Sequence, residues 1–305
     1  MKKKIVIAGG SGFLGQILVN HFKKMSYNIV ILTRGNTKVK NDIKFVNWDA
    51  KNIGDWKNEL ENAEILINLT GKSVDCRYTE ANKREIISSR VNASKVLNKA
   101  VLSLENPPEI WFNASTATIY EFSLTTPMSE EKGIIGNDFS MSVAKAWEKA
   151  FYETKTPKTR KIALRISLVL GKSGGVIPVL KNLVSKYLGG HQGNGKQKFA
   201  WIHQDDFINI VDFCIKNESL KGPINCVSTS DINNKEFMKA FRKAMNISIG
   251  IPSPTFLIHF GAFFMRTEPE LILKSRYVVP QILLENGFQF QYKDVNKALD
   301  NILNA

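Results

Sequence analysis

Hydrophobic residues in the first half of the chain form short runs, separated by segments with helical spacing. Runs rich in Ile, Val and Leu occupy residues 5–8, 28–33 and 65–71. Their length and β-branched content are typical of strands buried on both faces. Between the first two runs, residues 16–24 carry apolar side chains at the spacing of an amphipathic helix. This alternation predicts an α/β protein built on a parallel sheet.

The same alternation continues with strands or helices predicted over residues 45–49, 79–102, 110–116, 140–152 and 161–170. The last of these runs is interrupted by Arg165. A charge inside a buried strand needs a partner, so Arg165 is expected either in a functional site or in a buried ion pair.

After residue 170 the pattern becomes less regular. It predicts a flexible loop at 189–195, an edge strand at 199–203, a helix at 207–216 and a helix at 235–245. Asp205 and Asp206 are expected to open the first of these helices as N-cap and first-turn acid, and Asn233 or Asn234 to cap the second.

A glycine-rich turn joins the first strand to the first helix. Gly9, Gly12 and Gly15 suit a tight turn, close approach of the backbone to a pyrophosphate, and close packing of the helix on the strand. The helix N-terminus then offers N–H groups to the phosphates. Such turns also use glycine for steric reasons alone, but this position, directly after the first strand, favours nucleotide binding.

The end of the second strand indicates which dinucleotide is bound. Sites that prefer NAD place a carboxylate there for the ribose hydroxyl, whereas NADP sites place a cation near the 2′-phosphate. Here Thr33 is followed by Arg34, with no carboxylate, and the sequence therefore predicts NADP. After the third strand, Asp49 either reaches the adenine side or forms an Asx turn.

Charge and composition exclude several classes of function. The net charge is +14, from 42 Lys and Arg against 28 Asp and Glu, but the lysines are dispersed and no nucleic-acid motif is present. We therefore expect no nucleic-acid partner. The three cysteines, Cys76, Cys214 and Cys226, are far apart and form no C-x-x-C pair, which argues against a disulfide framework and a metal site.

The lengths of the apolar stretches bear on whether the protein is secreted or inserted in a membrane. The N-terminal apolar run ends at Gly9, which is too short for a signal peptide. The longest apolar stretch, residues 256–265, is too short to span a bilayer. The sequence therefore predicts a cytoplasmic location and no membrane partner.

These motifs, in this order, resemble those of the extended short-chain dehydrogenase/reductases, in their epimerase-like branch. Gly9–Gly15 resembles the opening motif of that group, and Asn68–Gly71 its next cofactor-wall motif. Over nearly its whole length the chain is similar to an NAD-dependent epimerase/dehydratase-like family that ends in a C-terminal domain of unknown function. Further matches are Arg77–Glu80, Lys83, Ser88–Asn92, Trp147–Glu148, Leu164–Gly171, Gly195–Gln197, Trp201–Asp206 and Pro280–Phe290.

The resemblance implies a Rossmann-like, doubly wound parallel sheet with a small, mostly helical C-terminal substrate lobe. The NADP-binding domain would cover residues 1–170, with its sheet completed by parts of 195–230. The substrate lobe would cover 171–305 and include the domain of unknown function at about 250–300.

The resemblance also assigns cofactor contacts. Pyrophosphate contacts fall on Gly9, Ser11, Gly12, Phe13 and Leu14; 2′-phosphate contacts on Thr33 and Arg34; and adenosine contacts on Leu69, Thr70 and Gly71. Further contacts fall on Glu85, Arg90 and Lys145, and Ser167 would approach the nicotinamide.

For catalysis, the resemblance implies a Tyr-x-x-x-Lys pair and a hydroxyl at the end of the preceding strand. The tyrosine moves a proton while the nicotinamide exchanges a hydride. Thr116 or Ser115 fits the hydroxyl, and Lys145 fits the lysine. Met141 occupies the tyrosine position, and a thioether cannot transfer that proton.

By residue type alone, three other side chains are alternatives to the tyrosine, namely Tyr78, Tyr120 and His203. Packing is the expected role of Tyr120, and capping that of His203. The chain also departs from the family at Glu121, where glycine is usual. Its Arg276-Tyr277 order replaces the usual Gln-Arg, so no substrate-side arginine is assigned there.

Two hypotheses follow. The first is an NADP(H)-binding, epimerase-like oxidoreductase that acts on a small polar molecule in the cleft between the cofactor domain and the C-terminal lobe. The second is a catalytically idle NADP-binding regulatory or sensor protein. Helices that flank such a sheet often pair between subunits, so a homodimer is compatible with either hypothesis.

Overall fold

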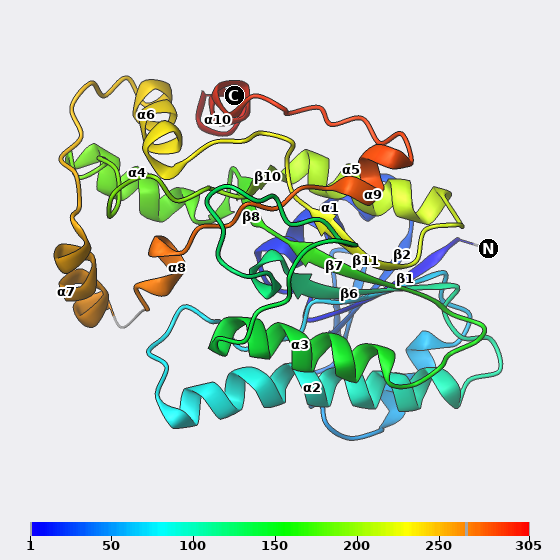
Figure 1. The fold of residues 1–305 in the computed structure, drawn as a ribbon. Helices are drawn as coiled ribbons and strands as arrows, with labels where there is room; N and C mark the ends of the chain where they lie inside the picture. Colours follow the sequence, from blue (N-terminus) through cyan, green and yellow to red (C-terminus); the bar gives the residue numbers. More distant parts are fainter. Residues whose placement is uncertain (1, 266–267, 305) are drawn as a thin grey trace.

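One large sheet with helices on both faces organises the molecule (Figure 1). The computed structural model describes residues 2–265 and 268–304. Its eight-stranded sheet has the order β11-β7-β6-β5-β1-β2-β4-β3, and all pairs are parallel except β3 with β4. The strands are β1 (Lys4–Ala8), β2 (Asn28–Thr33), β3 (Lys38–Lys40), β4 (Ile43–Asn47), β5 (Ile65–Asn68), β6 (Ile110–Thr116), β7 (Arg160–Ile166) and β11 (Gly222–Cys226).

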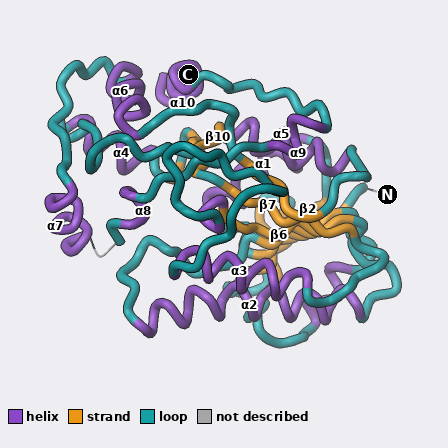
Figure 2. Tube along the Cα trace, viewed as in Figure 1, coloured by secondary structure: helices purple, strands orange, loops and turns teal. Residues whose placement is uncertain are grey.

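The strands are buried on both faces, as their continuous apolar runs predict. On one face Ile5 and Ile7 of β1 belong to the same core as Leu18; on the other, Val6 and Ala8 pack into a second core. Figure 2 shows the strands gathered between two helical layers. The covering helices are α1 (Phe13–Lys24) and α5 (Gln204–Lys216) on one side, and α2 (Glu80–Leu102) and α3 (Phe139–Tyr152) on the other. The doubly wound fold is thereby confirmed.

Between β7 and β11 the chain forms a second, smaller sheet. Its three strands have the order β10-β8-β9. They are β8 (Leu168–Gly171), β9 (Gly174–Gly175) and β10 (Trp201–His203). The helices of this part are α4 (Ile177–Ser185), α6 (Asn234–Ala244), α7 (Thr255–Met265), α8 (Glu270–Leu273) and α10 (Val295–Asn304). α9 (Gln281–Glu285) packs instead on β11 of the large sheet. Two short 3-10 helices, Asp55–Leu60 and Ala117–Ile119, follow β4 and β6 of the large sheet.

The single strand predicted over residues 161–170 is wrong. The chain leaves the large sheet after Ile166, and β8 pairs with β10 instead of β11. The break falls at Ser167, whose N–H donates to the Cys226 carbonyl at 3.1 Å, while Leu168 N–H donates to the Ala200 carbonyl at 3.3 Å. A continuous apolar run cannot reveal this change of sheet, because both halves are buried.

The predicted start of α5 is also wrong. This helix begins at Gln204, and its N-cap is His203, whose Nδ1 accepts from Asp205 N–H at 3.1 Å. Asp206 is buried and accepts from the N–H groups of Gln291 and Tyr292 at 2.8 and 2.9 Å. Instead of capping its own helix, Asp206 ties α5 to the chain that leads into α10.

Local capping chemistry agrees with the sequence elsewhere. Asn233 caps α6, and Glu236 completes a capping box. Asp49 forms the Asx turn, accepting from the N–H groups of Lys51 and Asn52 at 2.8 Å each. Of the two roles that the sequence left open for Asp49, the structure therefore shows the turn.

Candidate functional site

The candidate site lies at the sheet edge where the strand order reverses, between β1 and β5. Parallel strands end at a common edge, and ligands of this fold bind beyond it. Gly9 N–H donates to the Leu32 carbonyl at 3.0 Å, and Leu69 N–H donates to the Ala8 carbonyl at 2.8 Å. The chain segments that follow β1, β2 and β5 therefore lie next to one another. The sequence predicted nucleotide contacts in each of them separately.

The glycines of the first loop have different roles. A Cβ on Gly15 would lie 2.3 Å from the Gly10 carbonyl oxygen, so Gly15 is required for packing of the helix on the loop. A Cβ on Gly12 would meet nothing within 4 Å. Gly12 is the N-cap of α1, which has no side-chain cap and no acid in its first turn. An uncapped N-terminus beside open space fits a pyrophosphate.

Phe13 has a second role besides its place in the loop. Cβ atoms on Gly171 and Gly174 would lie 2.6 and 2.4 Å from its ring. The glycines of the β8–β9 turn therefore leave room for this ring, which anchors the second sheet to the start of α1. Leu14 packs on the main core, and Ser11 is exposed at the turn, so it is accessible to a ligand.

At the adenosine end, Arg34 is exposed directly after β2. Asn47 Nδ2 donates to the carbonyls of Arg34 and Gly35 at 3.3 and 3.0 Å, which fixes the turn. Lys72, and to a smaller extent Arg34 and Lys51, hold the pKa of Glu85 below its usual value. Lys72, Arg34 and Lys51 are therefore close enough to Glu85 to stabilise its carboxylate at this end of the site.

Glu85 and Arg90 both hold the turn after β5. Glu85 pairs with the ammonium of Lys72. Arg90 donates to the Lys72 carbonyl at 2.9 Å, and its guanidinium lies 4.9 Å from the Trp147 ring centroid. Burial lowers the pKa of Arg90 to about 10. A Cβ on Gly71 would lie 2.9 Å from this guanidinium, so a glycine at this position lets Arg90 pack against the turn.

Thr70 has a buried hydroxyl that has no hydrogen-bond partner in the described part of the chain. Its N–H donates to Asn68 Oδ1 at 3.0 Å, and Asn68 Nδ2 donates to Asn113 Oδ1 at 2.7 Å. Unpaired buried polar atoms are costly. The orphaned hydroxyl at the end of β5 fits a site that a polar ligand completes.

The two candidate hydroxyls at the end of β6 are not equivalent. Ser115 Oγ donates to Glu148 Oε1 at 2.6 Å and is buried. Thr116 is half-buried, and its hydroxyl lies 3.0 Å from that of Thr118. Thr116 Oγ1 also accepts from Thr118 N–H at 3.2 Å, but it contacts no carboxylate and its side chain is less buried, so Thr116 is the more accessible of the two hydroxyls.

Arg165 is part of a buried ion pair, which is one of its two predicted roles. Its Nε and Nη2 donate to the two carboxylate oxygens of Glu148 at 2.9 and 2.8 Å. Its Nη1 donates to the Tyr120 hydroxyl at 2.6 Å, and Tyr120 donates to Asn225 Oδ1 at 2.9 Å. This network joins α3 to β7 and β11. It also gives Tyr120 the packing role that was expected.

Met141 leaves the tyrosine position without an acid. Its side chain is buried, and its sulfur would lie 2.1 Å from a Cβ on Gly136. Lys145, one turn later, donates to Asn137 Oδ1. Ser167 was predicted near the nicotinamide. Its hydroxyl donates to the Cys226 carbonyl at 2.8 Å, and it directly follows Ile166, which pairs with Thr116 in the large sheet.

Tyr78 and His203, two other candidates for the missing proton donor, are each held in a packing or capping role. Burial raises the pKa of Tyr78 to about 12, which disfavours the phenolate form that a catalytic tyrosine of this type needs. Its ring lies 4.7 Å from that of Phe139. His203 is fully buried, caps α5 and stacks on Tyr292 at 3.7 Å. The capping role expected for His203 is confirmed.

An ionic cluster that the sequence does not reveal joins α8 to the N-terminus of α3. Lys274 Nζ bonds the carboxylates of Asp138 and Glu270, and Ser140 donates to Glu270. Asp138 is the N-cap of α3 and accepts from Met141 N–H at 2.8 Å. Lys274 and Asp138 are far apart in sequence, and neither belongs to a motif.

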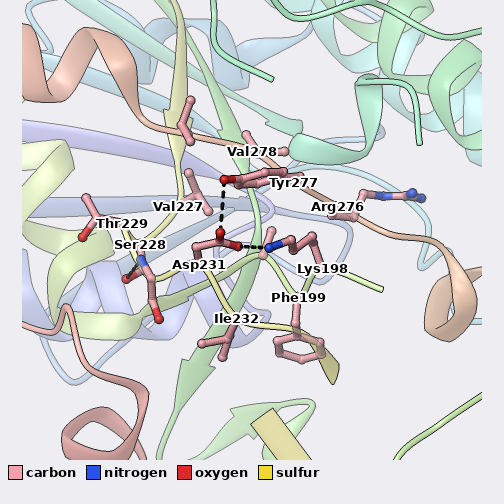
Figure 3. A pocket seen from close by; sticks show the side chains of 13 residues that line it. Lys198, Phe199, Val227, Ser228, Thr229, Asp231, Ile232, Arg276, Tyr277 and Val278 are labelled. Carbon is pink, nitrogen blue, oxygen red and sulfur yellow. Dashed lines mark hydrogen bonds and ion pairs between the residues drawn. The ribbon is translucent and has the colours of Figure 1, made fainter. Parts of the chain in front are cut away.

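Arg276 lies near the same ionic cluster. Burial lowers its pKa, an effect that the nearby carboxylates of Asp138 and Glu270 oppose. Figure 3 shows its side chain pointing away from Tyr277, which borders a cavity of about 110 Å³. Tyr277 donates to Asp231 Oδ2 at 3.1 Å. Arg276 therefore lies close to Asp138, the N-cap of α3, and a substrate-side role for it remains unassigned.

Two negative findings concern the described residues, 2–265 and 268–304. They contain no group of three or more His, Cys, Asp or Glu side chains that could hold a metal ion. None of the helices within them is long and apolar enough to cross a membrane.

Comparison with known proteins identifies the family. The model of the NAD dependent epimerase/dehydratase family matches residues 5–226, and that of a domain of unknown function (DUF1731) matches residues 253–302. The chain belongs to the NAD dependent epimerase/dehydratase family. Epimerase family protein SERP0438 of Staphylococcus epidermidis is 30% identical over 304 residues, 99% of this chain and 100% of that protein. Epimerase family protein YfhF of Bacillus subtilis is 30% identical over 302 residues, with 98% and 97% coverage.

Solved structures of the family agree with the fold. The human epimerase family protein SDR39U1, crystallised with NADPH, superimposes with a TM-score of 0.88 at 26% identity, covering 99% of this chain and 100% of that one. UDP-N-acetylglucosamine 4-epimerase of Bacillus cereus shares the fold, with a TM-score of 0.75, 20% identity and coverage of 99% and 95%. Membership of the epimerase family and the nicotinamide-cofactor fold are thus established.

Gly12 and Gly15 give a matched pair of variants. Gly12→Ala should leave the thermal midpoint within about 2 °C of wild type, because its Cβ meets no atom. It should weaken NADPH binding at least about tenfold, because the methyl group obstructs close approach of a phosphate. Gly15→Ala should instead destabilise the fold. Calorimetry and fluorescence titration measure both effects; unchanged NADPH affinity in Gly12→Ala would contradict the assignment.

Glu148→Gln tests the buried network. It leaves Arg165 without its charge partner, and we expect a loss of about 3–5 kcal/mol in the free energy of unfolding. Glu153→Gln is the control on the same helix, because its ion pair with Lys95 is 3.8 Å long and exposed; it should cost less than about 1 kcal/mol. Urea denaturation compares the two, and equal losses would refute the special role of the network.

Proposed function

We propose that the protein is an NADP(H)-dependent oxidoreductase of epimerase type that acts on a small polar carbonyl or alcohol. The observation that carries the proposal is the meeting of the uncapped α1 N-terminus, the unpartnered Thr70 hydroxyl and exposed Arg34 at one sheet edge. Arg34 supports NADP over NAD, because it stands where a ribose-binding carboxylate would otherwise be. The NADPH in the human relative's structure supports the same choice.

The chain's own residues suggest a division of roles. The glycine loop and Arg34 hold the phosphates, while Glu85 and Arg90 keep the wall after β5 in place. NADP, when bound, supplies the hydride chemistry. Thr116 donates a hydrogen bond to the substrate oxygen, and the ammonium of Lys145 stabilises negative charge there. Because Met141 offers no proton, the proton comes from Lys145 or from water.

Burial of Met141 favours a second candidate function. Its side chain fills the space beside Gly136, and a thioether cannot act as the proton donor at this position. A protein that binds NADP without turnover, as a sensor of the nucleotide's redox state, would need nothing more than the cofactor half of the site.

Nucleotide preference is tested by fluorescence titration with NADPH and NADH. NADPH should bind more tightly, and Arg34→Ala should weaken NADPH about tenfold or more while leaving NADH nearly unchanged, because only NADPH carries the 2′-phosphate. Lys99→Ala, which removes an exposed cation at the far end of α2, serves as control. Equal affinity for both nucleotides in the wild type would refute the choice of NADP.

Turnover separates the two candidate functions. With NADPH and a panel of small carbonyl compounds, Thr116→Val should lower kcat about a hundredfold or more while NADPH affinity stays within about threefold. Lys145→Met should lower kcat by a similar factor and, because Lys145 is also an expected cofactor contact, should weaken NADPH binding as well. Lys149→Met, an exposed lysine one turn further along α3, should have no effect. Absence of turnover in the wild type across the panel, with NADPH bound, favours the sensor.

A further inference from the structure

α7 presents large apolar side chains to solvent. Phe256 is 70% exposed and Phe260 is 64% exposed, whereas Ile258 and Ala262 are buried. Phe256 and Phe260 are one helical turn apart and share the outward face. A helix that is apolar on both its inward and outward faces is typical of one that is covered on both sides. The inner face of α7 is covered by protein, and its outer face is exposed in the single chain.

The apolar surface continues beyond this helix. Two segments next to α7 in the fold, one after α4 and one after α6, are joined by a hydrogen bond from Ile251 N–H to the Tyr187 carbonyl at 2.7 Å. Both segments expose apolar side chains and lie at the outer end of the C-terminal lobe, away from the large sheet (Figure 1). We call this surface the α7 patch; it consists of Tyr187, Leu188, Ile249, Ile251, Phe256, Leu257 and Phe260.

The two segments that carry most of the α7 patch contain cations but no carboxylate. Residues 172–204 contain five lysines and no Asp or Glu before Asp205, and residues 237–265 contain three cations and no Asp or Glu. Lys181, Lys186 and Lys243 are exposed.

Two carboxylates flank residues 237–265 in the sequence, and both accept hydrogen bonds from other parts of the chain. Glu236 accepts from Asn233 N–H at 2.8 Å in the cap of α6. Glu268 accepts from Tyr78 N–H at 2.7 Å on the side of the candidate site. The patch therefore combines exposed aromatic and aliphatic groups with a basic surround.

We propose that the α7 patch docks on the surface of an anionic lipid bilayer. A second copy related by a two-fold axis would place the same lysines opposite one another, whereas anionic headgroups complement them. Phenylalanine, leucine and isoleucine side chains enter the boundary between headgroups and acyl chains, as in interfacial helices. α7 lies along the membrane surface and does not span it. The sequence-based expectation of no membrane partner considered only spanning, so the proposal revises it.

Vesicle co-sedimentation of the full chain tests the apolar part. Binding should be strong with vesicles of phosphatidylcholine and phosphatidylglycerol, weak with phosphatidylcholine alone, and reduced by salt. The double variant F256S/F260S should bind anionic vesicles at least about tenfold more weakly. The control V39S/L102S removes exposed apolar groups from the other part of the molecule and should bind like the wild type. Equal loss in both double variants would overturn the proposal.

The basic part has its own test. Lys181→Gln and Lys186→Gln should each weaken binding about fivefold, and Lys38→Gln, on exposed β3, should not. Equal binding to neutral and anionic vesicles would overturn the proposal. So would sedimentation velocity showing a dimer that F256S/F260S dissociates, which would assign the patch to a second copy. The thermal midpoint of each variant reports whether it is folded, so the membrane result is independent of the proposed NADPH binding and oxidoreductase activity.

Discussion

The parallel pairing of β1 with both β2 and β5 is the constraint on which the candidate site depends. It brings the ends of three strands to one edge, and hydrogen bonds from Gly9 and Leu69 extend the ladder just beyond the strands. Gly15 then lets α1 lie against the loop, which directs the uncapped N-terminus of α1 over the same edge. The phosphate site proposed here would thus follow from strand order and one close packing contact, with few specialised side chains.

Features encoded in neighbouring residues were predictable from the sequence. Strand periodicity, the glycine loop and the cation after β2 depend on adjacent positions, and the fold and family were confirmed. The cap of α6 follows from the residues around Asn233, and its capping box is present. The loop glycines could not be ranked from the sequence, because the clash at Gly15 and the open space at Gly12 depend on how the helix packs.

Features that depend on distant pairs were not predictable. The sequence predicted that Arg165 has a partner, but that partner, Glu148 on α3, is identified only when the helix and the strand are packed together. That contact also distinguishes Ser115 from Thr116, which look alike in the sequence. The ionic cluster of Lys274 with Asp138 joins segments with no shared motif. The break at Ser167 is hidden because the residues on both sides of it are apolar.

The two halves of the site differ in how completely they are built. The nucleotide half has an open helix terminus, exposed Arg34 and an unpartnered Thr70 hydroxyl, while the reacting half has Met141 in place of the expected phenol. Amide hydrogen exchange with and without NADPH tests nucleotide binding at this edge most directly. We predict slower exchange at residues 9–15 and 69–72 when NADPH is present, with α7 unchanged. Unchanged exchange in both segments at saturating NADPH would contradict a nucleotide site at this edge.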